Sequence, residues 1–309
     1  MTFSVTILGS SSAIPTSVRS LTAQVVNIHE RFFLIDCGEG TQVQIRRYRI
    51  NMGKINHIFI SHLHGDHVFG IFGLLSTLSL MGRKGELHLY GDARLQIIIE
   101  QHLELMQTEL NFGIVYHHLT PGKSDIIYED KMVKVKTIPL KHRTNTWGFL
   151  FSEKPKELNL KKEAISKYNL GFKEIVNIKR GHDHVTPEGA TIPVRELTMP
   201  PYKTRSYAYC SDTRFTRSII TLIKQVSVLY HESTFLHRDL NLAKDTLHST
   251  ALEAAKIAAE AKVGKLLLGH FSVRYKNMDE FKNEATGIFP ETSIVEDGET
   301  YSIPLERVS

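Results

Sequence analysis

His62-Leu63-His64-Gly65-Asp66-His67 places three imidazoles and one carboxylate within six positions. It follows His57-Ile58-Phe59-Ile60, an apolar run rich in β-formers that indicates a buried strand. A strand that ends in this motif presents several metal ligands from one tight loop. Imidazole and carboxylate ligands suit zinc, manganese or iron(II) better than calcium or magnesium. The alternative is a polar loop that is rich in histidine by chance.

Other candidate functional residues share one placement, because each comes just after an apolar, strand-like run. These residues are Asp36, His142, Asp212, Glu232 and His270. In layered α/β folds, ligands bind at one end of the strands, where the loops converge. Residues that are far apart in the sequence are therefore expected to meet at one edge of the fold.

The combined residues supply enough ligands for two metal ions. One predicted set is His62, His64 and His142, and the other is Asp66, His67 and His270. Asp212 is predicted to bridge the two sets with its carboxylate oxygens. Two metals roughly 3.5–4 Å apart suit the hydrolysis of a phosphate ester, because they share a nucleophile and spread the transition-state charge. The pattern predicts a dinuclear hydrolase site.

Three further residues are predicted to support this site. Asp36 is expected to accept a hydrogen bond from a ligand imidazole and fix its tautomer, although capping of the turn at 38–40 is also open. His248 stands just before a helix that begins near Thr250, and a helix N-terminus attracts phosphate. His248 is predicted to protonate a leaving oxygen, with Glu232 orienting it; the alternative is a simple neighbour of the helix cap.

Composition limits the class of protein. The chain has 309 residues, 41% of them hydrophobic, and a formal net charge of +5, which is compatible with a polyanionic partner. Its two cysteines, Cys37 and Cys210, exclude a disulfide framework and favour a reducing cytosol. The longest nearly apolar stretch, 68–81, is too short to span a bilayer, so we expect a cytoplasmic protein without a membrane partner.

Strand-like and helical runs alternate along the chain, which predicts a layered α/β fold. The expected strands are 4–8, 23–26, 32–35, 57–60, 86–90, 132–138, 146–151, 206–210, 227–230 and 265–268. Helices are expected at 68–81, 93–109 and 250–262, and in the last of these Thr250 and Glu253 are spaced as a capping box.

Residues 152–204 interrupt this pattern. Between 151 and 205 there are eleven Lys and Arg against seven Asp and Glu, a net charge of +4. The segment is predicted to be an inserted basic arm; an ordinary solvated surface excursion is the alternative.

The ligand motif, followed in order by His142, Asp212 and His270, resembles the metallo-β-lactamase hydrolases. Further motifs are similar to those of the ribonuclease Z family within that superfamily. They are the runs 34–42, Pro139-Leu140-Lys141-His142, Ser211-Asp212-Thr213, His231-Glu232-Ser233-Thr234, His248-Ser249-Thr250 and 269–275.

The resemblance implies a single hydrolase domain over 1–309, folded as an αβ/βα four-layer sandwich, in which arm 152–204 grips the body of a tRNA. It implies a homodimer with two Zn²⁺ per chain, for which Mn²⁺ or Fe²⁺ are alternatives. It also implies Asp66 as proton acceptor, His248 with Glu232 as the acid side, and Arg274 near the phosphate. The implied reaction is removal of the 3′ trailer from precursor tRNA, leaving a 3′-hydroxyl on the tRNA.

Two other functions are weighed against this one. A small-molecule phosphodiesterase or ester hydrolase would need the same metals and would not need a basic arm. A tRNA-binding protein that has lost catalysis is disfavoured, because the ligand set, His248 and Glu232 are all present.

Overall fold

The structure is a computed structural model that describes residues 1–308. The chain forms two compact units: residues 1–152 with 206–303, and residues 153–205 with the tail that begins at Pro304. Within the described residues, no helix is both long enough and apolar enough to cross a membrane.

The first unit is built from two seven-stranded sheets. The first sheet, in spatial order, contains β16 (Thr300–Ser302), β1 (Phe3–Gly9), β2 (Ala23–Ile28), β3 (Arg31–Ile35), β4 (Ile55–Phe59), β5 (Leu87–Gly91) and β6 (Ile114–His118). The second contains β15 (Thr292–Ile294), β14 (Lys265–Gly269), β13 (Val228–Glu232), β12 (Ser206–Cys210), β9 (Trp147–Glu153), β8 (Val133–Pro139) and β7 (Ile126–Glu129). All ten predicted strands are confirmed within one or two residues at each end.

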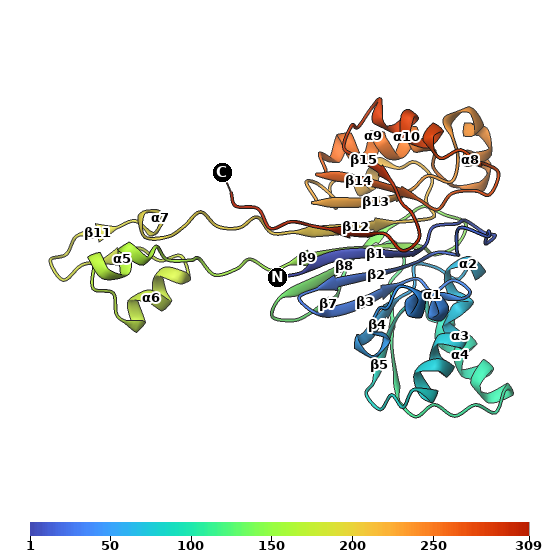
Figure 1. The fold of residues 1–309 in the computed structure, drawn as a ribbon, viewed down its shortest axis with the longest axis horizontal. Helices are drawn as coiled ribbons and strands as arrows, with labels where there is room; N and C mark the ends of the chain where they lie inside the picture. The colour runs from blue at the N-terminus through green and yellow to red at the C-terminus, as the bar shows by residue number, and fades with distance from the viewer. Residues whose placement is uncertain (309) are drawn as a thin grey trace. The chain divides into compact units, whose positions relative to one another are not determined.

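Helices cover the outer faces of both sheets (Figure 1). On the first sheet they are α1 (Thr41–Arg47), α2 (Gly65–Val68), α3 (Gly70–Leu80) and α4 (Arg94–Leu105). On the second they are α8 (Leu240–Thr246), α9 (Ala251–Ala261) and α10 (Asp279–Thr286). One buried cluster lies beneath α3 and α4, and a larger one fills the space between the sheets and under α9. The predicted αβ/βα four-layer sandwich is confirmed.

Local sequence explains how α3 reaches its place. A Cβ atom on Gly70 would lie 2.0 Å from the carbonyl oxygen of Gly38, so only glycine permits this approach. The Gly70 N–H donates to the carbonyl of Cys37 at 2.8 Å. The N-terminus of α3 is therefore fixed against the loop after β3, which also fixes the motif loop directly before it.

The second unit is small and has its own core. Its elements are α5 (Lys162–Lys167), α6 (Phe172–Lys179), β10 (His184–Val185), β11 (Thr191–Ile192) and α7 (Val194–Leu197). Ala164, Leu170, Ile178 and Leu197 form the buried cluster. At the two ends of the segment, Arg205 donates two hydrogen bonds to the buried carboxylate of Glu153, at 2.9 and 2.7 Å. This pair joins the segment's first and last residues.

Candidate metal centre

The ligand motif lies where β4 ends and α2 begins. After Phe59 the chain continues through a buried Ser61 and His62. Helix α2 starts at Gly65, directly after His64, so Asp66 and His67 stand in its first turn. The His67 N–H donates to the carbonyl of His64 at 3.0 Å. This tight turn directs side chains from both sides of the loop toward one point.

The second sheet contributes residues from the loops that follow its strands. His142 follows β8, Asp212 follows β12 and His270 follows β14. Asp212 and His270 have φ values of 57° and 59°, in the left-handed region that L-residues rarely adopt. Each such residue costs about 1–2 kcal/mol of backbone strain, and strain of this kind clusters at functional sites.

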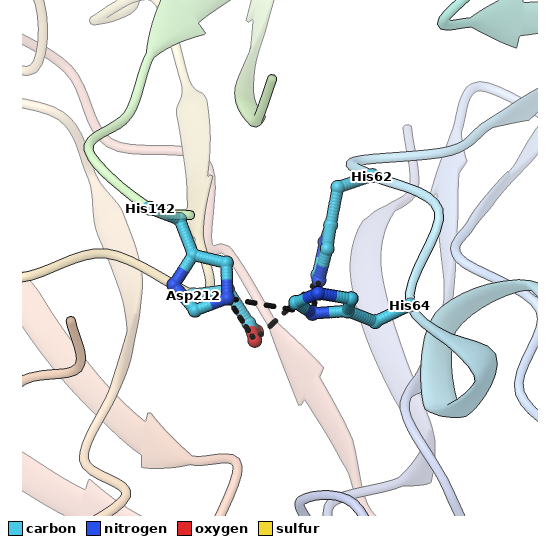
Figure 2. Close-up of side chains that lie close together, drawn as sticks. All are labelled: His62, His64, His142 and Asp212. Carbon is cyan, nitrogen blue, oxygen red and sulfur yellow. Dashed lines mark hydrogen bonds and ion pairs between the residues drawn. The ribbon is translucent and has the colours of Figure 1, made fainter. Parts of the chain in front are cut away.

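One group of ligand atoms is formed by His62, His64, His142 and Asp212 (Figure 2). Nδ1 of His64 lies 2.9 Å from Nε2 of His62 and 3.4 Å from Nε2 of His142. Oδ2 of Asp212 lies 3.6 Å from Nε2 of His62 and 3.8 Å from Nε2 of His142. Three ring nitrogens and one carboxylate oxygen therefore surround a common point.

A second group is formed by Asp66, His67 and His270. The two Nε2 atoms lie 3.3 Å apart, and Oδ2 of Asp66 lies 3.5 Å from each of them. The other oxygen of Asp212, Oδ1, lies 3.1 Å from Nε2 of His67 and 3.2 Å from Nε2 of His270. The carboxylate of Asp212 thus presents one oxygen to each group.

The donor atoms fit metal ions. In a tetrahedral zinc site with bonds of about 2.1 Å, neighbouring ligand atoms are about 3.4 Å apart, close to the separations within both groups. A pair of these nitrogens can also hydrogen-bond when one ring donates, but three ring nitrogens and a carboxylate oxygen that converge on one point are typical of a metal site. All seven residues that the sequence predicted as ligands are brought together.

Burial and charge set the pKa values in the metal-free cluster. Burial and the neighbouring charge of His67 hold the pKa of His62 well below its usual range. For His67, burial acts to lower the pKa, but the carboxylates of Asp212, Asp66 and Asp36 outweigh it and raise the pKa well above the usual value.

Buried partners hold the outer nitrogen of His67. Its Nδ1 lies 2.8 Å from Oδ2 of Asp36, a buried residue in the left-handed conformation directly after β3. The carboxylate also accepts hydrogen bonds from the N–H and the Oγ of Ser61, at 2.7 and 2.9 Å. Asp36 therefore contacts the ligand loop, and within residues 1–308 its carboxylate has no hydrogen bond to the turn at 38–40.

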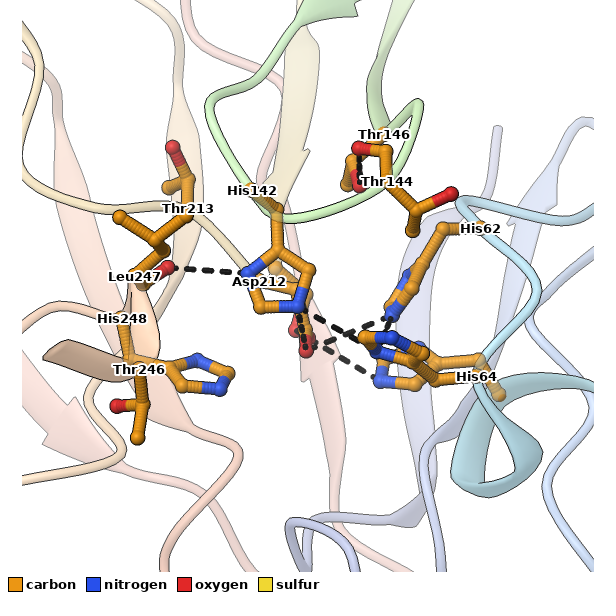
Figure 3. A network of polar contacts seen from close by, with 12 residues as sticks. His62, His64, His142, Thr144, Thr146, Asp212, Thr213, Thr246, Leu247 and His248 are labelled. Atoms are coloured by element: carbon orange, nitrogen blue, oxygen red, sulfur yellow. Dashed lines mark hydrogen bonds and ion pairs between the residues drawn. The ribbon is translucent and has the colours of Figure 1, made fainter.

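The other imidazoles have outer partners too. Nδ1 of His142 donates to the carbonyl of Leu247 at 3.1 Å (Figure 3). Nδ1 of His270 lies 3.0 Å from Oγ1 of Thr234. Because an Nδ1–H directed at the carbonyl leaves Nε2 unprotonated, the first contact selects the tautomer a metal needs.

Glu232 and His248 form a pair beside the cluster. Glu232 is buried at the end of β13 and accepts from the N–H groups of Thr213 and Thr234, at 2.8 and 3.2 Å. Its Oε1 lies 2.8 Å from Nδ1 of His248. Burial acts to lower the pKa of His248, but the negative charge of Glu232 outweighs it and raises that pKa to about 9. The ring centroids of His248 and His142 are 4.9 Å apart.

Arg274 lies near the cluster in sequence, and three residues that were not predicted contact its imidazoles or their partners. Arg274 is exposed in the loop after His270, and within residues 1–308 its side chain makes no ion pair. Sequence reasoning missed Ser61, Thr234 and Leu247 as partners of the imidazoles. Ser61 and Thr234 adjoin motif residues, which is a weak signal. Leu247 acts through its backbone carbonyl, which no residue type reveals.

Comparison with known proteins agrees with this architecture. Residues 3–155 match the family model described as "Anti-Pycsar protein Apyc1". The chain is 46% identical over 301 residues to ribonuclease Z of Parabacteroides distasonis, covering 97% of this chain and 99% of that protein. It is 46% identical over 311 residues to ribonuclease Z of Cytophaga hutchinsonii, covering 100% and 98% of the two chains.

Solved structures share the fold. The short form of human tRNase Z superimposes with a TM-score of 0.72 at 28% identity, covering 97% of this chain and 99% of that one. The metallo-β-lactamase fold protein YhfI from Bacillus subtilis gives a TM-score of 0.69 at 18% identity, covering 98% and 100%.

Proposed function

The chain belongs to the ribonuclease Z family, and from this membership and its site we propose that it is a metal-dependent endoribonuclease acting on precursor tRNA. It removes the 3′ trailer and leaves a 3′-hydroxyl on the tRNA. The single observation that carries the proposal is the placement of Asp212, which turns one carboxylate oxygen to each of two groups of imidazole nitrogens. That arrangement fits a pair of ions on one phosphodiester.

We propose two Zn²⁺ per chain, because nitrogen-rich donors with carboxylates and short donor separations suit zinc; Mn²⁺ and Fe²⁺ accept the same donors. One set of ligands is His62, His64 and His142, the other is Asp66, His67 and His270, and Asp212 presents an oxygen to each set. Bound there, the ions would activate a water and offset the charge that develops on the phosphate.

The protein's own groups handle the protons. Asp66 accepts the proton of the attacking water, and the N–H of Ala13 holds its Oδ2 at 2.8 Å. His248 donates a proton to the departing 3′ oxygen, while its Nδ1 is held by Glu232. The water oxygen forms a bond to phosphorus as the P–O3′ bond breaks, and the phosphate remains on the 5′ end of the trailer. Arg274, exposed after His270, is proposed to contact a phosphate of the substrate.

The basic arm, 152–204, is proposed as the tRNA-binding exosite. Lys162, Lys167, Lys173 and Arg180 are exposed in it, and Phe172 is 82% exposed at the start of α6. Lysines neutralise the phosphate backbone and an exposed aromatic ring stacks on bases. Replacing Lys167 and Lys173 with Gln is expected to weaken tRNA binding and flatten its salt dependence, relative to Lys224→Gln on the first unit; equal slopes would contradict the exosite.

We also propose a homodimer that acts in the cytoplasm. Leu80 and Met81 at the end of α3, and Leu105 and Met106 at the end of α4, are all more than half exposed. Exposed apolar side chains of this kind favour association between copies. Both cysteines are free and buried, which suits a reducing compartment. Light scattering that gave a monomer mass at micromolar concentration would contradict the dimer.

The decisive experiment is cleavage of a 3′-extended precursor tRNA with and without a chelator, followed by mapping of the new 3′ end. One chelator-sensitive cut after the discriminator base is the expected result. A protein that left this RNA intact while hydrolysing a small chromogenic phosphodiester would instead be a small-molecule phosphodiesterase. A protein that bound the RNA without cutting either substrate would be a binding protein that has lost catalysis.

A further inference from the structure

A cavity of about 510 Å³ opens next to His142. It is formed by the loop 140–146 together with Arg94 at the start of α4 and the turn at Pro121 and Gly122. Its volume lies in the range of about 300–1,000 Å³ that is usual for small-ligand sites. His142, a proposed metal ligand, is one wall of this cavity, so an occupant would lie directly beside the reactive centre.

The cavity is lined by three cations and by no carboxylate. Lys141 and Arg143 flank His142 and are exposed, and within residues 1–308 neither forms an ion pair. One nitrogen of Arg143, Nη2, donates to the backbone carbonyl of Asp245 at 2.9 Å, which positions the guanidinium without neutralising it. These two side chains give the cavity a positive potential.

Arg94 is anchored rather than free. It donates from Nε and Nη2 to the two oxygens of Asp92, each at 2.8 Å, and Asp92 also accepts from Nδ2 of Asn145 at 3.2 Å. This network fixes the rim of the cavity. Thr144 and Asn145 add neutral polar groups to the lining. The lining is suited to an anion that also carries hydrogen-bonding groups.

We propose that this cavity binds the sugar-phosphate backbone of the trailer just beyond the cut, with Lys141 and Arg143 contacting the first phosphate after the scissile one. The proposal rests on the proposed function. His248, which serves the departing oxygen of the tRNA, is absent from the cavity lining. Figure 3 shows Thr144 and Thr146 near His62, with His248 across the His142 ring from them. The Thr144 and Thr146 side of the cavity thus lies across His142 from the group that serves the departing tRNA oxygen, which is where we place the trailer.

Trailer length tests the proposal, because a trailer of one nucleotide has no phosphate beyond the scissile one. Wild type, Lys141→Gln and Arg143→Gln would be compared on one precursor tRNA carrying trailers of one, two or six nucleotides. For two and six nucleotides, KM should rise about tenfold in each variant, since a charge-assisted contact is lost. For one nucleotide, KM should stay within twofold of wild type. Lys224→Gln is the matched control, because Lys224 is exposed and does not line the cavity.

A second measurement uses the released product. A 5′-phosphorylated hexaribonucleotide should inhibit wild type and inhibit both variants about tenfold more weakly, while metal content stays equal in all proteins.

An equal rise in KM for all three trailers would overturn the proposal and assign the cations to the tRNA side. Unchanged KM and inhibition would overturn it as well. If wild type cut none of the precursors, the proposed function would fail, and binding of the hexaribonucleotide would still decide whether the cavity is an anion site.

Discussion

The hydroxyl of Tyr209 donates to Oδ2 of Asp36 at 2.6 Å, and the same oxygen lies 2.8 Å from Nδ1 of His67. All three side chains are buried. Tyr209 comes from β12 of the second sheet, whereas Asp36 and His67 follow strands of the first. A chain of hydrogen bonds thus crosses the interior of the sandwich and ends on a proposed metal ligand.

Tyr209→Phe should weaken metal binding about tenfold, the lower end of the effect of outer partners on metal affinity. The ring remains stacked on Tyr230, so only the hydrogen bond to Asp36 is removed. Tyr207→Phe is the matched control, because that hydroxyl is equally buried and donates to Gln24. Competition with a chromogenic chelator measures the affinity. Equal affinities for the two variants would show that Tyr209 does not position His67.

Glu232→Gln should lower kcat by about 10²-fold or more with little change in KM, because His248 loses its orienting partner. A precursor with sulfur in place of the 3′ bridging oxygen has a leaving group that needs no proton. On that substrate the variant should approach the wild-type rate. The same loss on both substrates would mean that Glu232 acts in some way other than through the leaving group.

His57 should make the fold sensitive to acid. Burial, followed by the charges of His88 and His117, lowers the pKa of His57 to about 4 in the folded protein, against 6.5 for the free side chain. The unfolded chain therefore takes up the proton first as the pH falls. The contribution of His57 to the free energy of unfolding should be fully present above pH 6.5 and should be lost as the pH falls from 6.5 to 4.

His57→Phe removes this titration while keeping a ring beside Phe33 and Tyr128. Between pH 6.5 and 4, its free energy of unfolding should fall less steeply than that of wild type. Urea titrations at several pH values measure the difference. His118→Gln, at an exposed position, serves as the control. Parallel curves for wild type and His57→Phe would show that other groups cause the acid sensitivity.

Thr250→Ala should lower the free energy of unfolding by about 1 kcal/mol. Oγ1 of Thr250 accepts from the N–H of Glu253 at 3.3 Å, and the Glu253 carboxylate accepts from the N–H of Thr250 at 3.0 Å. Urea unfolding of the chelated protein measures the cost without a contribution from bound metal. Thr286→Ala at the end of α10 should cost less than half as much, since that side chain caps no N-terminus. Similar costs would mean that the capping box adds little.

Local signals in the sequence were sufficient for much of the fold. Alternating apolar runs located the ten strands, and the spacing of Thr250 and Glu253 located the start of α9. Six strands within residues 1–308 were not predicted: β6, β7, β15 and β16 form the edges of the two large sheets, where burial and its pattern are weak, and β10 and β11 are only two residues long. β16 is held by its pairing with β1, almost 300 residues away.

The sequence by itself determined which residues are proposed to carry the chemistry, because a histidine or carboxylate directly after a buried strand is visible in the order of residue types. Only the tertiary structure decided which of these groups contact one another and which neighbours orient them. The division of Asp212 between two groups depends on its left-handed backbone and on the distance between the sheets. Leu247 accepts the hydrogen bond of His142 through its backbone carbonyl, a group that every residue has. The hydrogen bond between Tyr209 and Asp36 joins residues that are 173 positions apart in the sequence. Contacts of these kinds arise from packing, which no local pattern encodes.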